Sequence, residues 1–256
     1  MIDPLSTFRL DGKVVIVTGS SSGLGERFAR VCDAAGASVV LAARRLDRLE
    51  ALAAGLTSAV AVKADFATDD AAPMVVEAAL SNFGAIDVVI NNAGTNRAVE
   101  AIDDTPEGFR DEMQVNLVGP YDLAARSAKW MIENGRSGSV VNIASVLGRV
   151  AGGPMNVPGY AASKGALIQL TRELASEWAR KNVRVNAIGP GWFESEMTAE
   201  TMFNDQRAHE FIKRGAPMGR GGHEHELDGA LLFLASDASS YVTGQTLFVD
   251  GGWTIV

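Results

Sequence analysis

The sequence is poor in the features that mark secreted, membrane and metal-binding proteins. Its single cysteine, Cys32, excludes an intrachain disulfide and a thiolate metal cage. No apolar run approaches the roughly 20 residues that a bilayer requires, and residues 1–10 lack the basic and apolar regions of a signal peptide. Lysine and arginine number 23 against 31 acidic residues, and the net charge of −8 disfavours nucleic acids and anionic membranes. These absences predict a cytoplasmic protein that binds neither nucleic acids nor anionic membranes.

The sequence instead offers short Val/Ile-rich runs that alternate with helical patterns along its 256 residues. The predicted strands are 14–17, 39–41, 60–62, 86–90, 140–143, 183–188 and 247–249. Strands alternating with helices predict right-handed crossovers, and Val/Ile runs predict burial on both faces. We therefore expect an α/β fold in one domain, residues 1–256: a Rossmann-type, doubly wound, seven-stranded parallel sheet with helices on both faces. Residues 192–222 break this rhythm, which predicts a substrate loop.

A glycine-rich turn, TGSSSGLG, joins the first predicted strand to the first predicted helix at residues 18–25. Its three glycines permit a tight turn and the close approach of a pyrophosphate, and the helix N-terminus adds unpaired N–H groups. At the end of the second strand an acidic residue would bind the 2′-hydroxyl of a dinucleotide's ribose, but this chain has Arg44 and Arg45. Because arginine holds a phosphate bidentately, we expect NADP(H) to be preferred over NAD(H), with Arg44 the first candidate and Arg45 the second.

Tyr160 and Lys164 lie four residues apart at the start of a helical pattern, so their side chains share one face. A phenol has a reference pKa of about 10, and a nearby ammonium group stabilises the phenolate and lowers that pKa. The tyrosine can then act as a general acid or base. Ser145 follows the fifth predicted strand, at the sheet edge where ligands bind, and its hydroxyl can hold a substrate oxygen. Residues 223–226, HEHE, show no third ligand nearby, so we expect no metal site.

Taken in order, these motifs resemble those of the short-chain dehydrogenase/reductase family, in its single-domain branch, with its 3-oxoacyl-carrier-protein reductase-like and gluconate 5-dehydrogenase-like members. The resemblance extends from Gly12 to Gly252. The family's TGxxxGxG, NNAG and PG motifs match residues 18–25, 91–94 and 190–191. Its catalytic residues match Asn116, Ser145, Tyr160 and Lys164. The cofactor-binding residues that it implies, together with the two arginines, are Thr18, Gly19, Ser21, Ser22, Gly23, Leu24, Gly25, Arg44, Arg45, Asp65, Phe66, Asn92, Ala93, Gly94, Tyr160, Lys164, Pro190, Gly191 and Ser195.

By this resemblance the chain is an NAD(P)(H)-dependent oxidoreductase that transfers hydride between the nicotinamide and a small carbonyl or secondary alcohol substrate. It implies that Tyr160 passes a proton to or from the substrate oxygen, that Ser145 orients this oxygen, and that Lys164 lowers the tyrosine pKa and binds the ribose. It also implies a homotetramer or homodimer. Candidate substrate contacts, chosen for their apolar character, are Met155, Val157, Trp192, Phe193, Met197 and Met202.

Two further inferences concern Asn116 and the choice between enzyme and sensor. Pro120 has no N–H, so the Asn116 carbonyl loses its usual helical partner and can accept from a water instead. We therefore expect an interrupted helix there, and the resemblance implies a water linking Lys164 to solvent. The alternative function is a non-catalytic dinucleotide-binding sensor, which would have no need of Ser145, Tyr160 and Lys164 together.

Overall fold

The structure is a computed structural model that describes residues 3–193 and 206–256. Its strands form one seven-stranded parallel sheet in the order β3-β2-β1-β4-β5-β6-β7. The strands are β1 (Val14–Thr18), β2 (Ser38–Ala43), β3 (Ala59–Lys63), β4 (Val88–Asn91), β5 (Gly138–Ile143), β6 (Val183–Pro190) and β7 (Thr246–Val249). The main helices are α1 (Gly23–Ala34), α2 (Leu46–Ala53), α3 (Ala71–Phe83), α4 (Pro106–Met113), α5 (Gly119–Glu133), α6 (Pro158–Trp178), α8 (Gln206–Gly215) and α9 (Asp228–Ala235).

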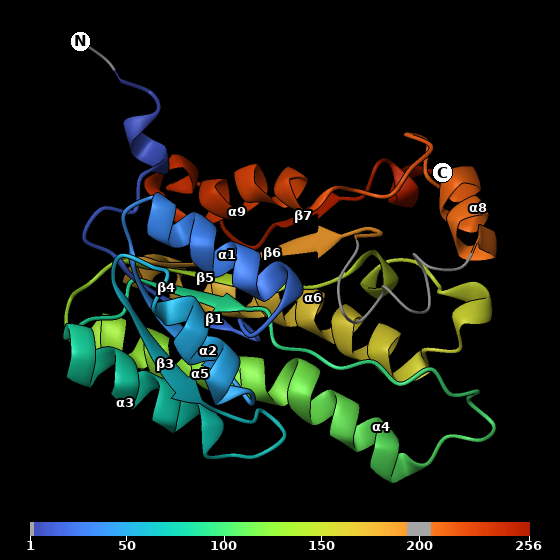
Figure 1. Cartoon of the computed structure of the whole chain (residues 1–256), viewed down its shortest axis with the longest axis horizontal. Helices are drawn as coiled ribbons and strands as arrows, with labels where there is room; N and C mark the ends of the chain where they lie inside the picture. The colour runs from blue at the N-terminus through green and yellow to red at the C-terminus, as the bar shows by residue number, and fades with distance from the viewer. Residues whose placement is uncertain (1–2, 194–205) are drawn as a thin grey trace.

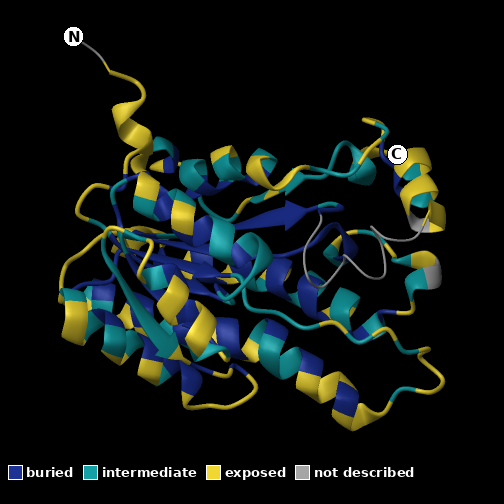
Figure 2. Ribbon diagram, viewed as in Figure 1, coloured by how far each residue is buried: buried dark blue, intermediate teal, exposed yellow. Residues whose placement is uncertain are grey.

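The predicted doubly wound α/β fold is confirmed. Every predicted strand overlaps an observed one, and the central strands are buried along their whole length because helices cover both faces of the sheet (Figures 1 and 2). One core layer packs under α1, α2 and α9 around Phe28, Leu49 and Leu231. The other packs under α3, α5 and α6 around Leu123 and Leu174. Among the described residues, no helix has both the length and the apolarity needed to cross a membrane.

The strand order reverses at β1, which pairs with β2 on one side and with β4 on the other. The chain therefore leaves these neighbouring strands in opposite directions and opens a crevice beyond their carboxyl ends. The same edge receives the ends of β5 and β6, whose last residues are Ile143 and Pro190. Segments far apart in the sequence thus meet at one place in the fold.

The helix that carries Asn116 is interrupted, as expected from Pro120. The chain passes from α4 into a π-helical turn, Gln114–Val118, before α5 begins. The backbone N–H of Gly119 donates to the Gln114 carbonyl, five residues back, rather than four as in an α-helix. A π-helical turn of this kind shifts the side chains that follow it around the helix axis, and such turns are frequent at functional sites.

Candidate active site

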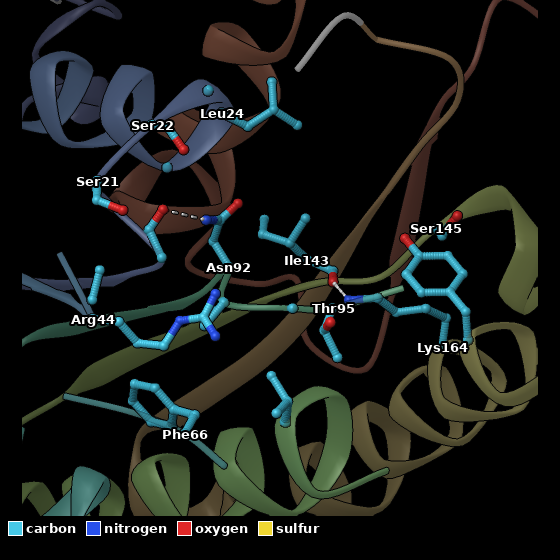
Figure 3. Close-up of a pocket in the computed structure, with 18 of the residues that line it drawn as sticks. Ser21, Ser22, Leu24, Arg44, Phe66, Asn92, Thr95, Ile143, Ser145 and Lys164 are labelled. Carbon is cyan, nitrogen blue, oxygen red and sulfur yellow. Dashed lines mark hydrogen bonds between the residues drawn. The ribbon is translucent and has the colours of Figure 1, made fainter. Parts of the chain in front are cut away.

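A cavity of about 590 Å³ lies at the carboxyl edge of the sheet and runs from the glycine turn after β1 to the start of α6 (Figure 3). It gathers residues from most of the strand ends. Of the residues predicted to bind the cofactor or to act in catalysis, those lining it are Gly19, Ser21, Ser22, Gly23, Leu24, Gly25, Arg44, Arg45, Asp65, Phe66, Asn92, Ala93, Gly94, Ser145, Tyr160, Lys164, Pro190 and Gly191.

The glycine turn requires glycine at several positions for identifiable reasons. Gly19 and Gly23 have φ angles of +67° and +53°, which L-residues with a side chain rarely adopt. At Gly25 a Cβ atom would collide with the Gly19 carbonyl oxygen, so helix α1 can start this close to the turn only with glycine there. At these glycines the turn therefore presents backbone, rather than side chains, to the cavity, as pyrophosphate binding requires.

Thr18 lies beneath the cavity and not in its lining, in contrast to its predicted place among the cofactor contacts. It is buried, and its hydroxyl accepts hydrogen bonds from the backbone N–H groups of Asn92 and Ala93 at 3.0 and 2.9 Å. The Asn92 side chain in turn donates to the Thr18 carbonyl at 2.9 Å. These bonds join the glycine turn to the loop after β4 across the crevice, so Thr18 shapes the site indirectly.

The two arginines after β2 have different surroundings. Arg45 donates to the hydroxyl of Ser21 at 3.0 Å and to that of Ser22 at 2.7 Å, so it braces the glycine turn. Arg44 is exposed, and its guanidinium group extends into the cavity between Asn92 and Phe66 (Figure 3). A cation in this place, beside the glycine turn, fits a phosphate-bearing ligand.

The far wall of this part of the cavity comes from the end of β3. Phe66 is buried and packs against Gly119 at the start of α5, where a Cβ atom would lie 2.9 Å from its ring. Asp65 is exposed at the cavity, and one of its carboxylate oxygens accepts from the Ala67 N–H at 3.1 Å. An apolar ring beside an exposed carboxylate suits a heterocyclic base with an exocyclic amino group. From the glycine turn to this wall, the cavity thus fits the adenosine and pyrophosphate part of a dinucleotide.

At the other end of the cavity the structure brings Ser145, Tyr160 and Lys164 together. Ser145 follows β5, and the other two residues lie on one face of the first turns of α6, as predicted. The Tyr160 hydroxyl is hydrogen-bonded to Ser145. The Lys164 Nζ lies 5.6 Å from the centre of the Tyr160 ring and donates to the Ile143 carbonyl at 2.7 Å (Figure 3). A phenol, a hydroxyl and an amine therefore face one cavity.

The pKa values of this group are governed by burial. Burial raises the pKa of the Tyr160 phenol because phenolate is costly to form away from water, whereas the hydrogen bond to Ser145 lowers it and the charge of Glu112 raises it. Burial also lowers the pKa of Lys164 to about 8. The sequence predicted that the lysine ammonium would lower the tyrosine pKa. That effect stays a prediction: the Lys164 amine lies 5.6 Å from the centre of the Tyr160 ring and donates its hydrogen bond to the Ile143 carbonyl.

Asn116 is fully buried behind the cavity rather than in its lining. Its side-chain oxygen accepts from the Thr95 N–H at 2.8 Å, and its amide donates to the Thr95 carbonyl at 2.9 Å and to the Ser163 hydroxyl at 3.0 Å. A Cβ atom at Gly94 would lie 3.3 Å from the Asn116 side chain and 3.6 Å from the Lys164 amine. The side chain of Asn116 thus fixes the loop that separates it from the lysine.

The predicted substrate contacts fall in several places. Trp192 packs edge-on against Phe211 and Trp253, with ring centroids 6.1 and 5.1 Å away, so it is largely committed to an aromatic cluster. Val157 is buried and Met155 half-buried beside this cluster. Phe193 lines the dinucleotide cavity instead. Three predicted residues lie outside the described part of the chain: Ser195, Met197 and Met202.

The sequence did not predict several residues that the structure places at the site, among them Thr95 and Ile143. Thr95 lines the cavity and binds Asn116 through its backbone, and Ile143 offers its carbonyl to Lys164. Ile143 ends a predicted strand, so its place at the ligand-binding edge of the sheet could have been predicted. Its contact with Lys164 could not, because any residue type can offer a backbone carbonyl. Among residues 3–193 and 206–256 no group of three or more His, Cys, Asp or Glu side chains is arranged to hold a metal ion.

The doubly wound sheet, with a glycine turn at its switch point, places the chain among the dinucleotide-binding α/β proteins. A family model described as enoyl-(acyl carrier protein) reductase matches residues 19–254. The 2-dehydro-3-deoxy-D-gluconate 5-dehydrogenase of Escherichia coli K12 is 37% identical over 254 residues, which cover 97% of this chain and 98% of that protein. The 3-oxoacyl-(acyl-carrier-protein) reductase of Thermotoga maritima is 38% identical over 251 residues, which cover 96% of this chain and 100% of that protein.

A solved structure supports the same relationship. The crystal structure of a gluconate 5-dehydrogenase from Burkholderia cenocepacia J2315, in complex with NADP and tartrate, matches with a TM-score of 0.92 at 36% identity, covering 99% of this chain and 100% of that one. The chain belongs to the short-chain dehydrogenase/reductase family. It is an NAD(P)(H)-dependent oxidoreductase that transfers hydride between a nicotinamide and a carbonyl or secondary alcohol, and nothing favours the sensor alternative.

Proposed function

We propose that Tyr160 is the general acid and base of this oxidoreductase, with Ser145, Lys164 and Asn116 as its partners. The observation that supports this most is the convergence of the phenol, the Ser145 hydroxyl and the Lys164 amine on one cavity that also contains the glycine turn. In carbonyl reduction the Tyr160 hydroxyl gives its proton to the substrate oxygen, and in alcohol oxidation the phenolate takes it back.

The other residues have distinct tasks. Ser145 holds the substrate oxygen beside the phenol by hydrogen bonding. Lys164, with its pKa lowered to about 8, can carry a proton at neutral pH and binds the ribose next to the nicotinamide. Asn116 is locked by Thr95 and Ser163 and keeps the loop at Gly94 in place, while its backbone carbonyl holds a water. The bound dinucleotide supplies the hydride, which is chemistry that no side chain provides.

Replacing Tyr160 with phenylalanine tests the assignment. We expect Tyr160→Phe to abolish turnover while NADPH still binds, because the change removes one hydroxyl and leaves the glycine turn intact. Tyr241→Phe is the control, since that side chain is fully exposed. Turnover is followed by NADPH absorbance with a panel of ketones, sugar acids and 3-oxoacyl thioesters, and binding by fluorescence. Substantial activity in Tyr160→Phe would refute the assigned role.

We also propose that NADP(H) is preferred over NAD(H) and that Arg44 is the main reason. Arg45 is engaged by Ser21 and Ser22, whereas Arg44 extends into the cavity. A hydrogen bond to a charged group contributes about 1.5–3 kcal/mol, so Arg44→Ala should lower kcat/KM for NADPH by roughly 10- to 150-fold and change that for NADH little. Arg30→Ala, at an exposed ion pair with Glu26, serves as the control. Comparable kcat/KM for both cofactors in the unaltered protein would contradict the proposal.

Three expectations about the substrate loop, the oligomeric state and the cellular location also remain proposals. Residues 192–222 form the substrate loop of a single catalytic domain, residues 1–256. The protein assembles as a homotetramer or homodimer, consistent with two apolar side chains that are exposed at the start of α5: Val118, just before the helix, is 43% exposed, and Tyr121, in its first turn, is 47% exposed. It works in the cytoplasm, consistent with a single, buried cysteine, Cys32. Light scattering at micromolar concentration tests the assembly, and a monomer would contradict it; cell fractionation tests the location.

A further inference from the structure

Glu112 is a charged side chain that the proposed mechanism does not use and that is nonetheless almost completely buried. It lies in the last turn of α4 with 1% of its surface exposed. Helix α4 packs here against the start of α6, the helix that carries Tyr160 and Lys164. Glutamate is rarely buried to this extent without full pairing, because a carboxyl group loses its hydration.

The two oxygens of this carboxyl group have different surroundings. Oε1 accepts a hydrogen bond from the backbone N–H of Arg97 at 2.8 Å. Oε2 has no hydrogen-bond partner among the described residues. It lies against Gly159, the residue directly before Tyr160, so closely that a Cβ atom at Gly159 would collide with it. Glycine at this position is therefore required by the glutamate and not by the backbone, since Gly159 has no positive φ.

We propose that Glu112 is a positioning residue for Tyr160: its carboxyl group joins the loop after β4 to the first turn of α6 and sets the pH range in which the phenol exchanges its proton. The inference rests on the proposed function, because it assigns a role through the Tyr160 hydroxyl. Glu112 itself is not among the residues that line the cavity. Its influence is exerted through the position of one helix turn and through its charge.

Few charged or titratable groups act on the Glu112 carboxyl group. The charged and titratable groups that act on Glu112 are Arg97 and Asp104, from the segment between β4 and α4, and the Tyr160 phenol on α6. Burial raises the pKa of Glu112, whereas the hydrogen bond from Arg97 and its charge lower it. An ionised carboxylate beside the phenol disfavours phenolate and so raises the pKa of Tyr160. Removing the charge must therefore move the tyrosine pKa downward.

The first test replaces Glu112 with glutamine, which keeps the shape and the acceptor for Arg97. Alcohol oxidation needs the phenolate, so in Glu112→Gln the acidic limb of the kcat profile should shift to lower pH. Glu107→Gln, at an exposed site in the first turn of the same helix, should leave the profile unchanged. A glutamate with a purely structural role would alter stability and not this profile. An unshifted profile in Glu112→Gln would overturn the electrostatic half of the proposal.

A second readout needs no turnover. The chain has three tyrosines, so the absorbance of tyrosinate can be titrated and the signal of Tyr160 isolated by subtracting that of Tyr160→Phe. The phenol should ionise at lower pH in Glu112→Gln than in the unaltered chain, within the range where circular dichroism shows that the fold is intact. Identical titrations in both backgrounds would count against the inference.

The third test uses the contact with Gly159. In Gly159→Ala the new methyl group collides with the Glu112 carboxyl group and displaces the turn that carries Tyr160. We expect kcat/KM to fall by about 10- to 100-fold, since a displacement near 1 Å can cost this much, while the Kd for NADPH changes little. Glu112→Ala in the same chain removes the colliding oxygen, so the double variant should recover to the activity of Glu112→Ala alone. A double variant that is poorer than Glu112→Ala alone, or a Glu112→Ala variant as active as the unaltered chain, would overturn the positioning role.

The outcomes separate this inference from the proposed function. If Tyr160→Phe retains activity, the assignment of the general acid fails, and the role of Glu112 fails with it. If Tyr160→Phe is inactive but Glu112→Gln matches Glu107→Gln in its pH profile, only the inference about Glu112 is refuted.

Discussion

Replacing Lys164 with methionine should make the protein more stable while it destroys its activity. Lys164 is 4% exposed, and burial lowers its pKa to about 8 from an ordinary value of 10.5. Each pKa unit corresponds to about 1.4 kcal/mol, so holding this ammonium charged in the folded state costs about 3 kcal/mol. Methionine fills a similar volume without a charge. It leaves the Ile143 carbonyl without its donor, a loss of about 1 kcal/mol, so we expect a net gain of about 2 kcal/mol near neutral pH.

The gain must depend on pH in a definite direction. Because the folded-state pKa lies below the unfolded one, the unfolded chain binds more protons between pH 8 and 10.5. The destabilisation of the folded state by the buried Lys164 ammonium group is therefore fully present below pH 8 and disappears as the pH rises towards 10.5. The advantage of Lys164→Met should shrink over this window and finally reverse, since only the missing hydrogen bond to the carbonyl is left.

Urea unfolding of the cofactor-free protein at pH 7 and at pH 10 measures this difference. Lys129→Met is the matched control, because Lys129 is exposed and lies 3.8 Å from Glu133 in a surface ion pair, which contributes at most about 1 kcal/mol. The reasoning would be refuted if Lys164→Met were less stable than the unaltered chain at pH 7, or if its advantage grew between pH 7 and pH 10.

Three further predictions follow from local contacts. Gly25→Ala should abolish NADPH binding because its Cβ atom would strike the carbonyl at the glycine turn, whereas Gly229→Ala, with open space around it, should bind normally in a fluorescence titration. The thiol of Cys32, buried and with its pKa raised to about 12, should resist a thiol reagent until urea unfolds the chain; rapid labelling of the folded protein would contradict this. Asp87→Ala should lower the free energy of unfolding by about 1–3 kcal/mol, since it orphans the buried N–H of Val14; an unchanged urea midpoint would show otherwise.

Much of the fold could be predicted because its signals are local. Strands buried on both faces need runs of Val and Ile, and such runs are visible in the sequence at β1 and β4. The glycine turn at residues 18–25 and the four-residue spacing of Tyr160 and Lys164 are equally short-range. Each depends on the geometry of one turn or one helix, so the residue pattern alone determines which side chains share a face.

Other features depended on contacts between distant segments. The sequence offered two adjacent arginines after β2, but only the folded chain ties Arg45 to the serines of the glycine turn and leaves Arg44 in the cavity. It offered Trp192 as a substrate contact, but the structure packs its ring against Trp253 near the C-terminus. The type of a residue determines which interactions it can make, but the fold determines which partner lies next to it.

By itself, then, the sequence determined the alternation of strands and helices, the glycine turn, and the shared helix face of Tyr160 and Lys164, because each is encoded within a few consecutive residues. Only the tertiary structure decided the environment in which these two side chains lie: the burial that raises the pKa of Tyr160, the carbonyl that receives Lys164, and the carboxyl group of Glu112 pressed against Gly159. The physical reason is that desolvation and charge act between whichever groups the fold brings close, however far apart they lie along the chain.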